Sequence, residues 1–394
     1  MIPQIELSRL DLDPSGSLRR KAPRPRRYRQ ADYDEKFDAL TVLYDCFLAS
    51  DGETVVCLGP PLFNLKRKVL RPIESAFHIP FFSRRDLRCL DHVMQLRLLT
   101  EVRAAPVRKN RFQQAVIKVQ PNHCELFRCR RALMTISKDN ELTWIRDWVH
   151  FHATNHGCDA VLMYDNNSTK YDTDRLRDTI SSVPGIAVAV VVKWPFPFGP
   201  GGGPSRAWDS DFAQYAMLEH GRHRFLAHAE GVINADVDEL VMTVGGLSVF
   251  ELAKNSQTGY LQYTGTMIEN VSHLDGSDTV RHANFRYRNC PPRSAIRKWT
   301  VVPTRCPENS QWLVHDVVGM QPDQSASAQV EHRHFAGITT GWRRAISVPA
   351  PHPTEAHAVD EEAVRFMQCI AEGAEGNHEP TPGGHPGAGG LHGA

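Results

Sequence analysis

The sequence lacks a long hydrophobic run. Its longest uninterrupted apolar stretch covers residues 186–192, whereas a helix that crosses a membrane needs about 20 apolar residues. The first 13 residues also carry acidic side chains where a secretory signal peptide has an apolar segment. We therefore expect no membrane-spanning helix, no export by the usual secretory route and a cytoplasmic location.

An excess of charge of one sign is lacking as well. Lysine and arginine number 46 and aspartate and glutamate number 45, which gives a formal net charge of +1. This balance excludes a surface that binds polyanions over its whole area, and we expect no nucleic-acid partner.

One segment departs from this balance. Residues 1–30 end in a basic cluster interrupted by two prolines, which prevent a helix there. The segment is predicted to be a disordered basic tail. It is either simply solvated or makes peripheral contact with the anionic inner face of a membrane, where each basic residue adds about 1 kcal/mol. The cluster consists of Arg19, Arg20, Lys21, Arg24, Arg26, Arg27 and Arg29.

Closely spaced cysteine pairs are also missing. The nine cysteines are scattered, and the closest two, Cys124 and Cys129, have no second pair with which to form a four-ligand zinc site. We interpret the cysteines as reduced thiols of a cytosolic protein.

The composition is that of a globular protein, with 41% hydrophobic and 23% charged residues. At 394 residues, two or three domains are expected. Short apolar runs separated by turn signals predict a small β-rich domain over residues 31–128, without a motif that carries chemistry. Residues 346–371 are predicted to form a C-terminal helix or extension. Residues 372–394 are rich in glycine, proline and histidine and are predicted to be disordered.

From residue 131 onward, strand-like and helix-like patterns alternate. Strands are predicted at 132–136, 160–164, 186–192 and 224–234, and helices at 142–152, 173–181 and 208–220. Strands that alternate with helices indicate an α/β domain, a mostly parallel sheet with helices on both faces.

The strongest chemical signal follows the last of these strands. An apolar run ends in Asp236-Val237-Asp238-Glu239, and open α/β sheets bind ligands at the carboxyl ends of their strands. Carboxylate oxygens suit Mg²⁺ or Mn²⁺, which bridges to substrate phosphates. The alternative is an acidic surface turn, because Asp-x-Asp is common.

A second signal follows the strand at 160–164. There the chain enters the polar loop Asp165-Asn166-Asn167-Ser168-Thr169, whose groups could bind a nucleobase edge or ribose hydroxyls. The alternative is a turn with a helix cap, for which the same residue types are used.

Together these motifs resemble a family. The motifs in chain order are Ile136-Ser137-Lys138-Asp139-Asn140-Glu141, a helix with Trp144 and Trp148, Tyr164-Asp165-Asn166-Asn167-Ser168, Gln214, Asp236-Val237-Asp238-Glu239, Lys298-Trp299, His315 and His334-Phe335. This order resembles the GT-A glycosyltransferases, most of all the group related to glycosyltransferase families 2 and 92. The resemblance covers about residues 131–343. It departs at Leu240 and Phe335, where the family usually has phenylalanine and tyrosine.

The resemblance implies a GT-A fold, a Rossmann-like mixed sheet with helices on both faces, over residues 129–345. It also implies site residues. The donor-binding set is Lys138, Glu141, Asp165, Asn166 and Asp236, and the metal set is Asp236, Asp238 and His334 with Mn²⁺ or Mg²⁺. His315 or His332 could take the place of His334.

The residues leave the catalytic base open among Glu269, Asp275 and Asp316. The resemblance implies a metal-dependent transferase that moves a sugar from a nucleotide-sugar to a glycan, a lipid-linked acceptor or another hydroxyl. One alternative is a non-catalytic carbohydrate- or nucleotide-binding protein on a degenerate GT-A scaffold. Another is a nucleotidyl or phosphoryl transferase, although no glycine-rich phosphate loop ending in Lys-Ser or Lys-Thr is present.

Overall fold

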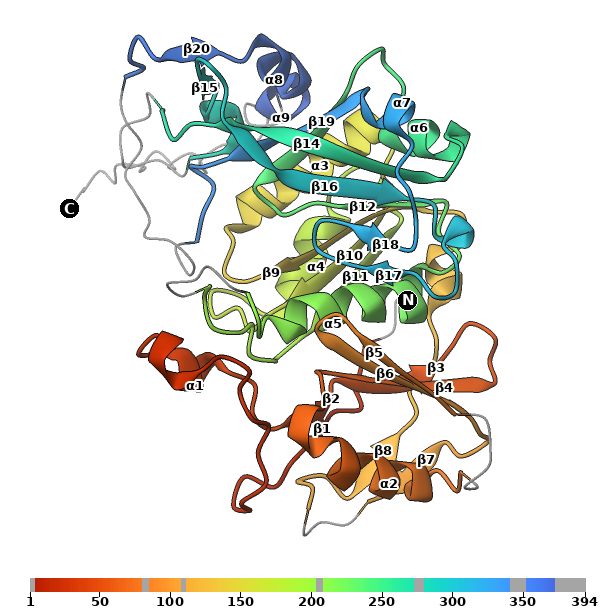
Figure 1. Ribbon diagram of the computed structural model, residues 1–394. Helices are drawn as coiled ribbons and strands as arrows, with labels where there is room; N and C mark the ends of the chain where they lie inside the picture. Colours follow the sequence, from red (N-terminus) through yellow and green to blue (C-terminus); the bar gives the residue numbers. More distant parts are fainter. Residues whose placement is uncertain are drawn as a thin grey trace, which may run out of the picture.

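The protein is a mixed α/β molecule, as the sequence predicts (Figure 1). The computed structural model describes residues 4–79, 85–107, 111–202, 208–272, 280–340 and 352–372. Two sheets dominate this part of the chain, a small one from the N-terminal third and a large one from the rest. None of the helices within these ranges is long and apolar enough to cross a membrane.

The large sheet has eight strands in the order β11-β10-β9-β12-β16-β14-β19-β13. The first four are parallel to one another, β14 is parallel to β19, and the remaining neighbours are antiparallel. The strands are β9 (Arg131–Ser137), β10 (Ala160–Asp165), β11 (Val188–Lys193), β12 (Gly231–Asn234), β13 (Glu239–Thr243), β14 (Tyr260–Ile268), β16 (Ser294–Val301) and β19 (Val330–Phe335).

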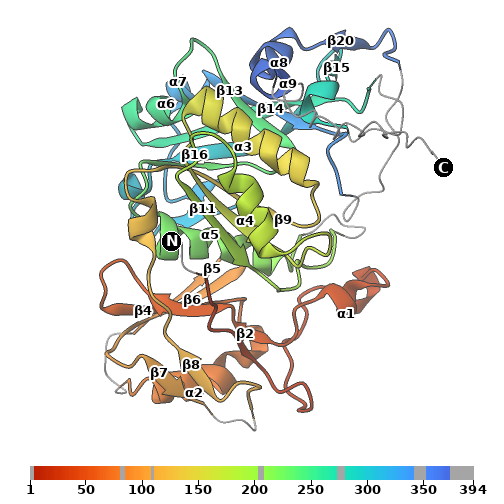
Figure 2. The ribbon, with the colours of Figure 1, turned by 180° about the vertical axis from the view of Figure 1, so that it is seen from behind.

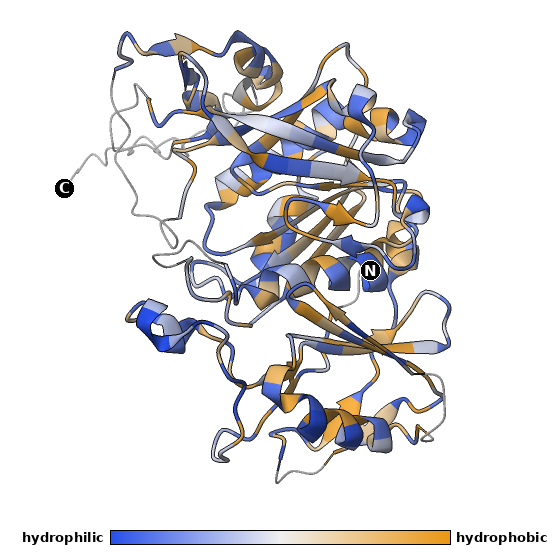
Figure 3. Ribbon diagram, viewed as in Figure 1, coloured by the Kyte–Doolittle hydropathy of each residue, from blue (hydrophilic) through white to orange (hydrophobic). Residues whose placement is uncertain are grey.

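Side-chain alternation along the parallel strands divides the core into two layers. Leu133 and Val161 belong to one buried cluster, whereas their neighbours Met134 and Leu162 belong to the other, because successive strand residues face opposite sides of a sheet. Helices α3 (Leu142–His156), α4 (Thr173–Ser181) and α6 (Val249–Asn255) cover the first face (Figure 2). Helix α5 (Phe212–Gly221) covers the second, so the predicted arrangement of helices on both faces is confirmed. The parallel strands β9, β10 and β11 between these layers are predominantly hydrophobic, whereas β14 and β16 carry more polar residues (Figure 3).

The helices begin and end at residues that suit those positions. The Asp172 side chain accepts a hydrogen bond from the backbone N–H of Arg175 and caps α4. Helix α6 begins with a capping box formed by Ser248 and Glu251. Helix α3 ends at Gly157, which has a φ of 66°, a left-handed conformation that glycine adopts without strain.

The small sheet is antiparallel, with strands in the order β3-β4-β6-β5. Its outer face carries the third hydrophobic cluster, which contains residues of α2 (Lys66–Ala76) and of the hairpin β7-β8. Its inner face packs against α5, which lies between the two sheets (Figure 1). The strands are β3 (Asp45–Leu48), β4 (Thr54–Gly59), β5 (Arg85–Leu90), β6 (Val93–Leu99), β7 (Ala104–Pro106) and β8 (Val116–Lys118). Side chains of both sheets therefore share one hydrophobic cluster.

The predicted disordered basic tail is wrong for residues 4–30. Strand β1 (Leu10–Asp11) pairs with β2 (Thr41–Leu43). The buried Arg20 guanidinium donates to the carbonyl oxygens of Pro61, Asp38 and Thr41. Arg24 is also buried, and it donates to Asp209 at 2.8 Å. These guanidinium groups hold the segment on the protein through hydrogen bonds to buried and partly buried acceptors.

The predicted strand at 224–234 is also wrong in its first half. Residues Arg222–Leu226 form one turn of π-helix that continues α5, and only Gly231–Asn234 form strand β12. Tertiary contact decides this difference, since the buried Arg224 side chain reaches Asp45 of the small sheet, at 2.7 Å.

The C-terminal part adds small elements. Strand β15 (Tyr287–Asn289) pairs with β20 (His357–Val359), and helices α8 (Glu361–Phe366) and α9 (Gln368–Glu372) follow. The predicted tail lies outside the described residues after Glu372. The remaining elements are α1 (Tyr33–Lys36), β17 (Gln311–Trp312), β18 (Val317–Val318) and α7 (Gln324–Ser327).

Candidate functional site

The acidic motif forms the connection between β12 and β13, which we call the acid loop (residues 235–239). These strands are the fourth and the eighth of the sheet, so about 19 Å would separate them if the sheet were flat. Five residue steps span at most about 18 Å when fully extended, and this loop is a turn, with the N–H of Glu239 bonded to the carbonyl of Asp236 at 2.9 Å. The sheet must therefore curl, and its curl brings strands from distant parts of the chain to the acid loop.

A buried lysine from β16 lies between two of the acids. The Lys298 ammonium is 2.7 Å from Oδ2 of Asp236 and 2.9 Å from Oε2 of Glu239, and only 1% of its side chain is exposed. The same Glu239 oxygen accepts the backbone N–H of Asp236 at 2.9 Å. Lys298 thus ties the first acid of the loop to the last one.

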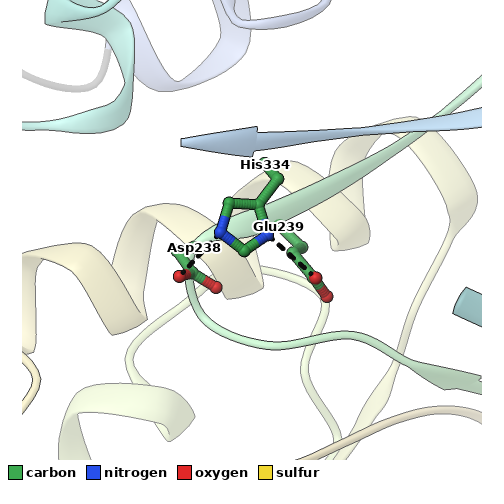
Figure 4. A group of neighbouring side chains, drawn as sticks. All are labelled: Asp238, Glu239 and His334. Atoms are coloured by element: carbon green, nitrogen blue, oxygen red, sulfur yellow. Dashed lines mark hydrogen bonds and ion pairs between the residues drawn. The ribbon is translucent and has the colours of Figure 1, made fainter. Parts of the chain in front are cut away.

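A histidine from β19 lies between Asp238 and Glu239 (Figure 4). His334 is the antiparallel partner of Glu239, and the N–H of Phe335 donates to the Asp238 carbonyl at 2.8 Å. The His334 ring places Nδ1 3.2 Å from Oε1 of Glu239 and Nε2 3.5 Å from Oδ2 of Asp238. Strand pairing, rather than sequence proximity, creates this trio.

The electrostatics of the two carboxylates differ. Burial against the protein raises the pKa of Asp238 to about 6, and the nearby His334 only partly offsets this. Burial also acts to raise the pKa of Glu239, but the Lys298 ammonium and the histidines hold it well below its ordinary value. Burial acts to lower the pKa of His334, but Asp238 and Glu239 raise it to about 9. Without a cation, His334 is therefore protonated at neutral pH.

Asp238 and His334 line a cavity of about 380 Å³, within the usual range for small-molecule sites. Five of the predicted site residues line it, namely Lys138, Asn166, Asp236, Asp238 and His334. Gln214 of α5, which belongs to the quoted motifs, also lines this cavity. Apolar side chains complete the wall, among them Met267, Phe335 and Ile338.

Two predicted donor-binding residues do not line this cavity. Asp165 is buried at the end of β10, where its carboxylate faces the N–H of Ser168 at 3.3 Å and burial raises its pKa. Glu141 forms an ion pair with Lys170. Asn166 lines the cavity, but its amide also donates to the carbonyl of Trp194 at 2.8 Å and thereby holds the next loop.

The structure brings neither of the two described base candidates to the cavity. Glu269 forms a bidentate pair with Arg293, at 2.8 and 2.6 Å. Asp316 accepts a hydrogen bond from the Tyr260 hydroxyl at 2.8 Å. Neither carboxylate is among the residues that line the cavity. Asp275 lies outside the described residues.

The two substitute histidines also lie outside the cavity lining. Nδ1 of His315 is 2.8 Å from the carbonyl oxygen of Arg297. His332 is buried against Gly265, where a Cβ would come within 2.3 Å of the ring, so only glycine leaves room for it. Its Nε2 lies 3.9 Å from Glu239, which is beyond hydrogen-bond distance.

Asp238, Glu239 and His334 are the described residues that could together approach a metal ion, because one ligand atom from each lies within 4.8 Å of the others. Glu239 is already engaged, since Oε2 accepts from Lys298 and from Asp236 N–H. Its Oε1 faces Nδ1 of His334, an arrangement that orients a histidine for coordination through its other nitrogen. Asp238 and Nε2 of His334 therefore offer the open ligand positions, and Glu239 supports them.

Sequence reasoning missed the part played by Lys298, which appeared only as a marker of the resemblance. The available signal was a lysine next to the mostly apolar segment 299–303, since a buried lysine needs a carboxylate partner. No protein-family model matches the chain, and the search of curated proteins finds no match. The functional argument therefore depends on the geometry of the site.

Proposed function

We propose that the protein is a metal-dependent glycosyltransferase with a GT-A fold that transfers a sugar from a nucleotide-sugar to a hydroxyl acceptor. The acceptor class is a glycan or a lipid-linked hydroxyl. The observation that carries the proposal is the meeting of Asp238 and His334 at the wall of a cavity, directly after a central strand. Ligands of α/β sheets bind at such strand ends.

The chemistry of the cavity supports a donor with a diphosphate. Lys138 provides a positive charge, and Asn140, Asn166 and Gln214 provide hydrogen-bonding groups around the same space. Asp238 and His334 suit Mn²⁺ or Mg²⁺ together with phosphate oxygens. When bound, such a cation would neutralise the charge that develops on the departing nucleoside diphosphate.

The chain's own residues have separate tasks in this proposal. Asp238 and His334 hold the cation, and Glu239 orients the His334 ring through Nδ1. Lys298 holds Asp236 at the cavity wall, where the Asp236 carboxylate can accept a hydrogen bond from a hydroxyl of the donor sugar-nucleotide. The apolar side chains of Met267, Phe335 and Ile338 exclude water from one side of the site.

The test measures thermal stabilisation by nucleoside diphosphates and nucleotide-sugars, each with and without Mn²⁺. A true ligand raises the melting temperature in proportion to RT ln(1 + [L]/Kd). We expect one nucleotide to stabilise the protein only with Mn²⁺, and Asp238→Ala and His334→Ala to remove that effect. Asp174→Ala is the control, because Asp174 lies on the exposed side of α4.

The outcomes distinguish the readings. Wild-type turnover by Asp238→Ala would exclude the metal site proposed here. Mn²⁺-dependent nucleotide binding without sugar transfer or donor hydrolysis would indicate a non-catalytic binding protein. Release of pyrophosphate or transfer of a phosphoryl group would indicate the nucleotidyl or phosphoryl transferase.

A further inference from the structure

Two cysteines in the small sheet lie directly opposite each other. Cys46 of β3 and Cys57 of β4 are antiparallel partners, and their sulfur atoms are 3.4 Å apart. Both side chains are completely buried in the cluster between the sheet and α2. Within the described part of the chain, these are the two cysteines whose sulfur atoms meet.

The backbone hydrogen bonds define the type of this pair. Ala49 donates to Thr54 at 2.8 Å, and pairs along an antiparallel ladder alternate between hydrogen-bonded and non-hydrogen-bonded. Three steps from Ala49, Cys46 therefore belongs to a non-hydrogen-bonded pair. Its carbonyl confirms this, because it points away from β4 and accepts the N–H of Gln120 at 2.8 Å.

This pair type has the spacing that a disulfide needs. Non-hydrogen-bonded partners have Cα atoms about 4.5 Å apart, inside the range of about 4.4–6.8 Å found for disulfides. The sulfur atoms must approach by about 1.4 Å to reach the S–S bond length, a movement that side-chain rotation supplies. No change of strand register is required.

We propose that Cys46 and Cys57 are an oxidation site, at which a low-molecular-weight disulfide converts the two thiols to a cross-strand disulfide. One cysteine, as thiolate, attacks the reagent and releases its first thiol. The other cysteine then attacks the mixed disulfide, closes the Cys46–Cys57 bond and releases the second thiol. The two protons of the cysteines end on the two released thiols, and the reagent takes up both electrons.

The surroundings determine when this reaction occurs. Burial raises the pKa of Cys46 well above its ordinary value, and the thiolate is the reactive form. Oxidation therefore proceeds while the chain folds or when the hairpin opens at its exposed tip, Ser50-Asp51-Gly52-Glu53. Other buried cysteines, such as Cys124 and Cys158, lack a partner sulfur and stay reduced.

The experiment refolds the full chain in a mixture of reduced and oxidised glutathione, then blocks free thiols with an alkylating agent. Cys46 and Cys57 lie on one tryptic peptide, residues 37–66, and a second cut after Glu53 separates them. Linked fragments therefore prove the bond by mass spectrometry. A triple variant, Cys89→Ser, Cys129→Ser and Cys290→Ser, removes the exposed thiols that could cross-link molecules.

We expect the Cys46–Cys57 link to be the main oxidised species in the wild-type chain and in the triple variant. The oxidised protein should unfold at a higher temperature than the reduced one, and Cys57→Ala should abolish the difference, whereas Cys158→Ala should preserve it. The proposal would be overturned if Cys46 and Cys57 were both alkylated after refolding, or if either were linked to another cysteine. A lower unfolding temperature of the linked form would overturn it as well.

Discussion

Two groups of charges, one almost completely buried and one that reaches a cavity, differ in how completely they are paired. The first, the Asp45 network, joins Asp45 of β3 to His220, Arg224 and, through His220, Tyr164. The second, the acid-loop cluster, consists of Asp236, Asp238, Glu239, Lys298 and His334.

In the Asp45 network, both carboxylate oxygens are occupied, and the side chains of Asp45 and His220 are completely buried. Oδ1 accepts the N–H of Ser8 at 2.6 Å, and Oδ2 accepts from His220 at 2.9 Å and Arg224 at 2.7 Å. Burial acts to raise the pKa of Asp45, but Arg224 and His220 lower it below its ordinary value. This network joins the small sheet to α5 and its π-turn.

In the acid-loop cluster, pairing is incomplete at one position. The Asp238 side chain is 28% exposed, faces the cavity, and has its nearest cationic partner at 3.5 Å. Its pKa is raised, whereas that of Asp45 is lowered. The comparison teaches that a fully satisfied buried charge holds the structure together, whereas an incompletely satisfied one at a cavity is available to a ligand.

The largest effect should come from Asp45→Ala. The substitution leaves the Arg224 guanidinium buried without its carboxylate, which costs about 3–5 kcal/mol of unfolding free energy. Urea denaturation measures this loss. The matched control is Glu125→Ala, which removes the exposed partner of Arg128 and should leave the free energy of unfolding almost unchanged, because water screens an exposed ion pair. If both variants lost the same unfolding free energy, the Asp45 network would not be important for stability.

Lys298→Met should have the next largest effect. It removes the cation between two carboxylates, and Glu239 retains only His334 and one backbone N–H as partners. We expect a loss of about 2–3 kcal/mol in urea denaturation and about 10–100-fold weaker Mn²⁺ binding, because the acid loop loses its anchor.

The control for this prediction is Lys254→Met, since Lys254 is exposed and lies 3.7 Å from Glu230. It should change neither quantity measurably. Unchanged Mn²⁺ affinity in Lys298→Met would show that the lysine does not position the acid loop.

The pH dependence of stability should separate the two groups of charges. Burial lowers the folded-state pKa of His220 below 6.5, so its contribution is complete above pH 6.5 and is lost as the pH falls. The folded-state pKa of His334 is raised to about 9, so its contribution is complete below pH 6.5 and is lost as the pH rises through about 9.

Urea midpoints in metal-free buffer between pH 5 and pH 10 measure both changes, the loss of stability on the acid side that comes from His220 and the loss on the alkaline side that comes from His334. The alkaline loss should be about 3 kcal/mol, because the pKa of His334 rises from 6.5 to about 9. His220→Gln should reduce only the loss of stability at acid pH, and His334→Gln only the loss at alkaline pH. The assignment would be wrong if either variant changed the pH dependence on the opposite side instead.

The smallest effect on stability should come from Asp238→Asn. Asp238 is partly exposed and its ion pair is long, so we expect a change within about 1 kcal/mol in metal-free buffer. Mn²⁺ binding, measured by calorimetry, should nevertheless be lost, because the substitution removes the negative charge of the carboxylate and one of its two oxygens. A large loss of stability would show that Asp238, like Asp45, mainly stabilises the fold.

Local patterns predicted most of the central layer. Helix α4 has the predicted bounds, because Asp172 is a local cap and the apolar spacing is regular. Strand β11 and helix α5 begin later than predicted, at Val188 and Phe212, since element ends depend on neighbours more than on propensity. The predicted strand at 224–234 overlaps the last three residues of the helical turn Arg222–Leu226, because the local sequence gave no sign of the Arg224 contact with Asp45.

At the site, the sequence located the acidic residues but did not predict which side chain each of them contacts. Asp236, Asp238 and His334 were all predicted as metal ligands, yet the structure pairs Asp236 with Lys298 and places Glu239 against His334. Glu141 and Asp165 were predicted to bind the donor, and the structure places both outside the cavity lining. Spacing along one strand cannot reveal which of several carboxylates meets a counter-charge from another strand.

The sequence by itself determined the alternation of strands and helices, the two-sided core and the position of an acid-rich loop at a strand end. These features depend on periodicity and on residues a few positions apart. Tertiary structure alone decided the curl of the sheet, the Lys298–Asp236 pair, 62 residues apart, and the Asp45–Arg224 pair, 179 residues apart. Such pairs depend on which strands become neighbours, and that is a property of the packed core rather than of any local pattern.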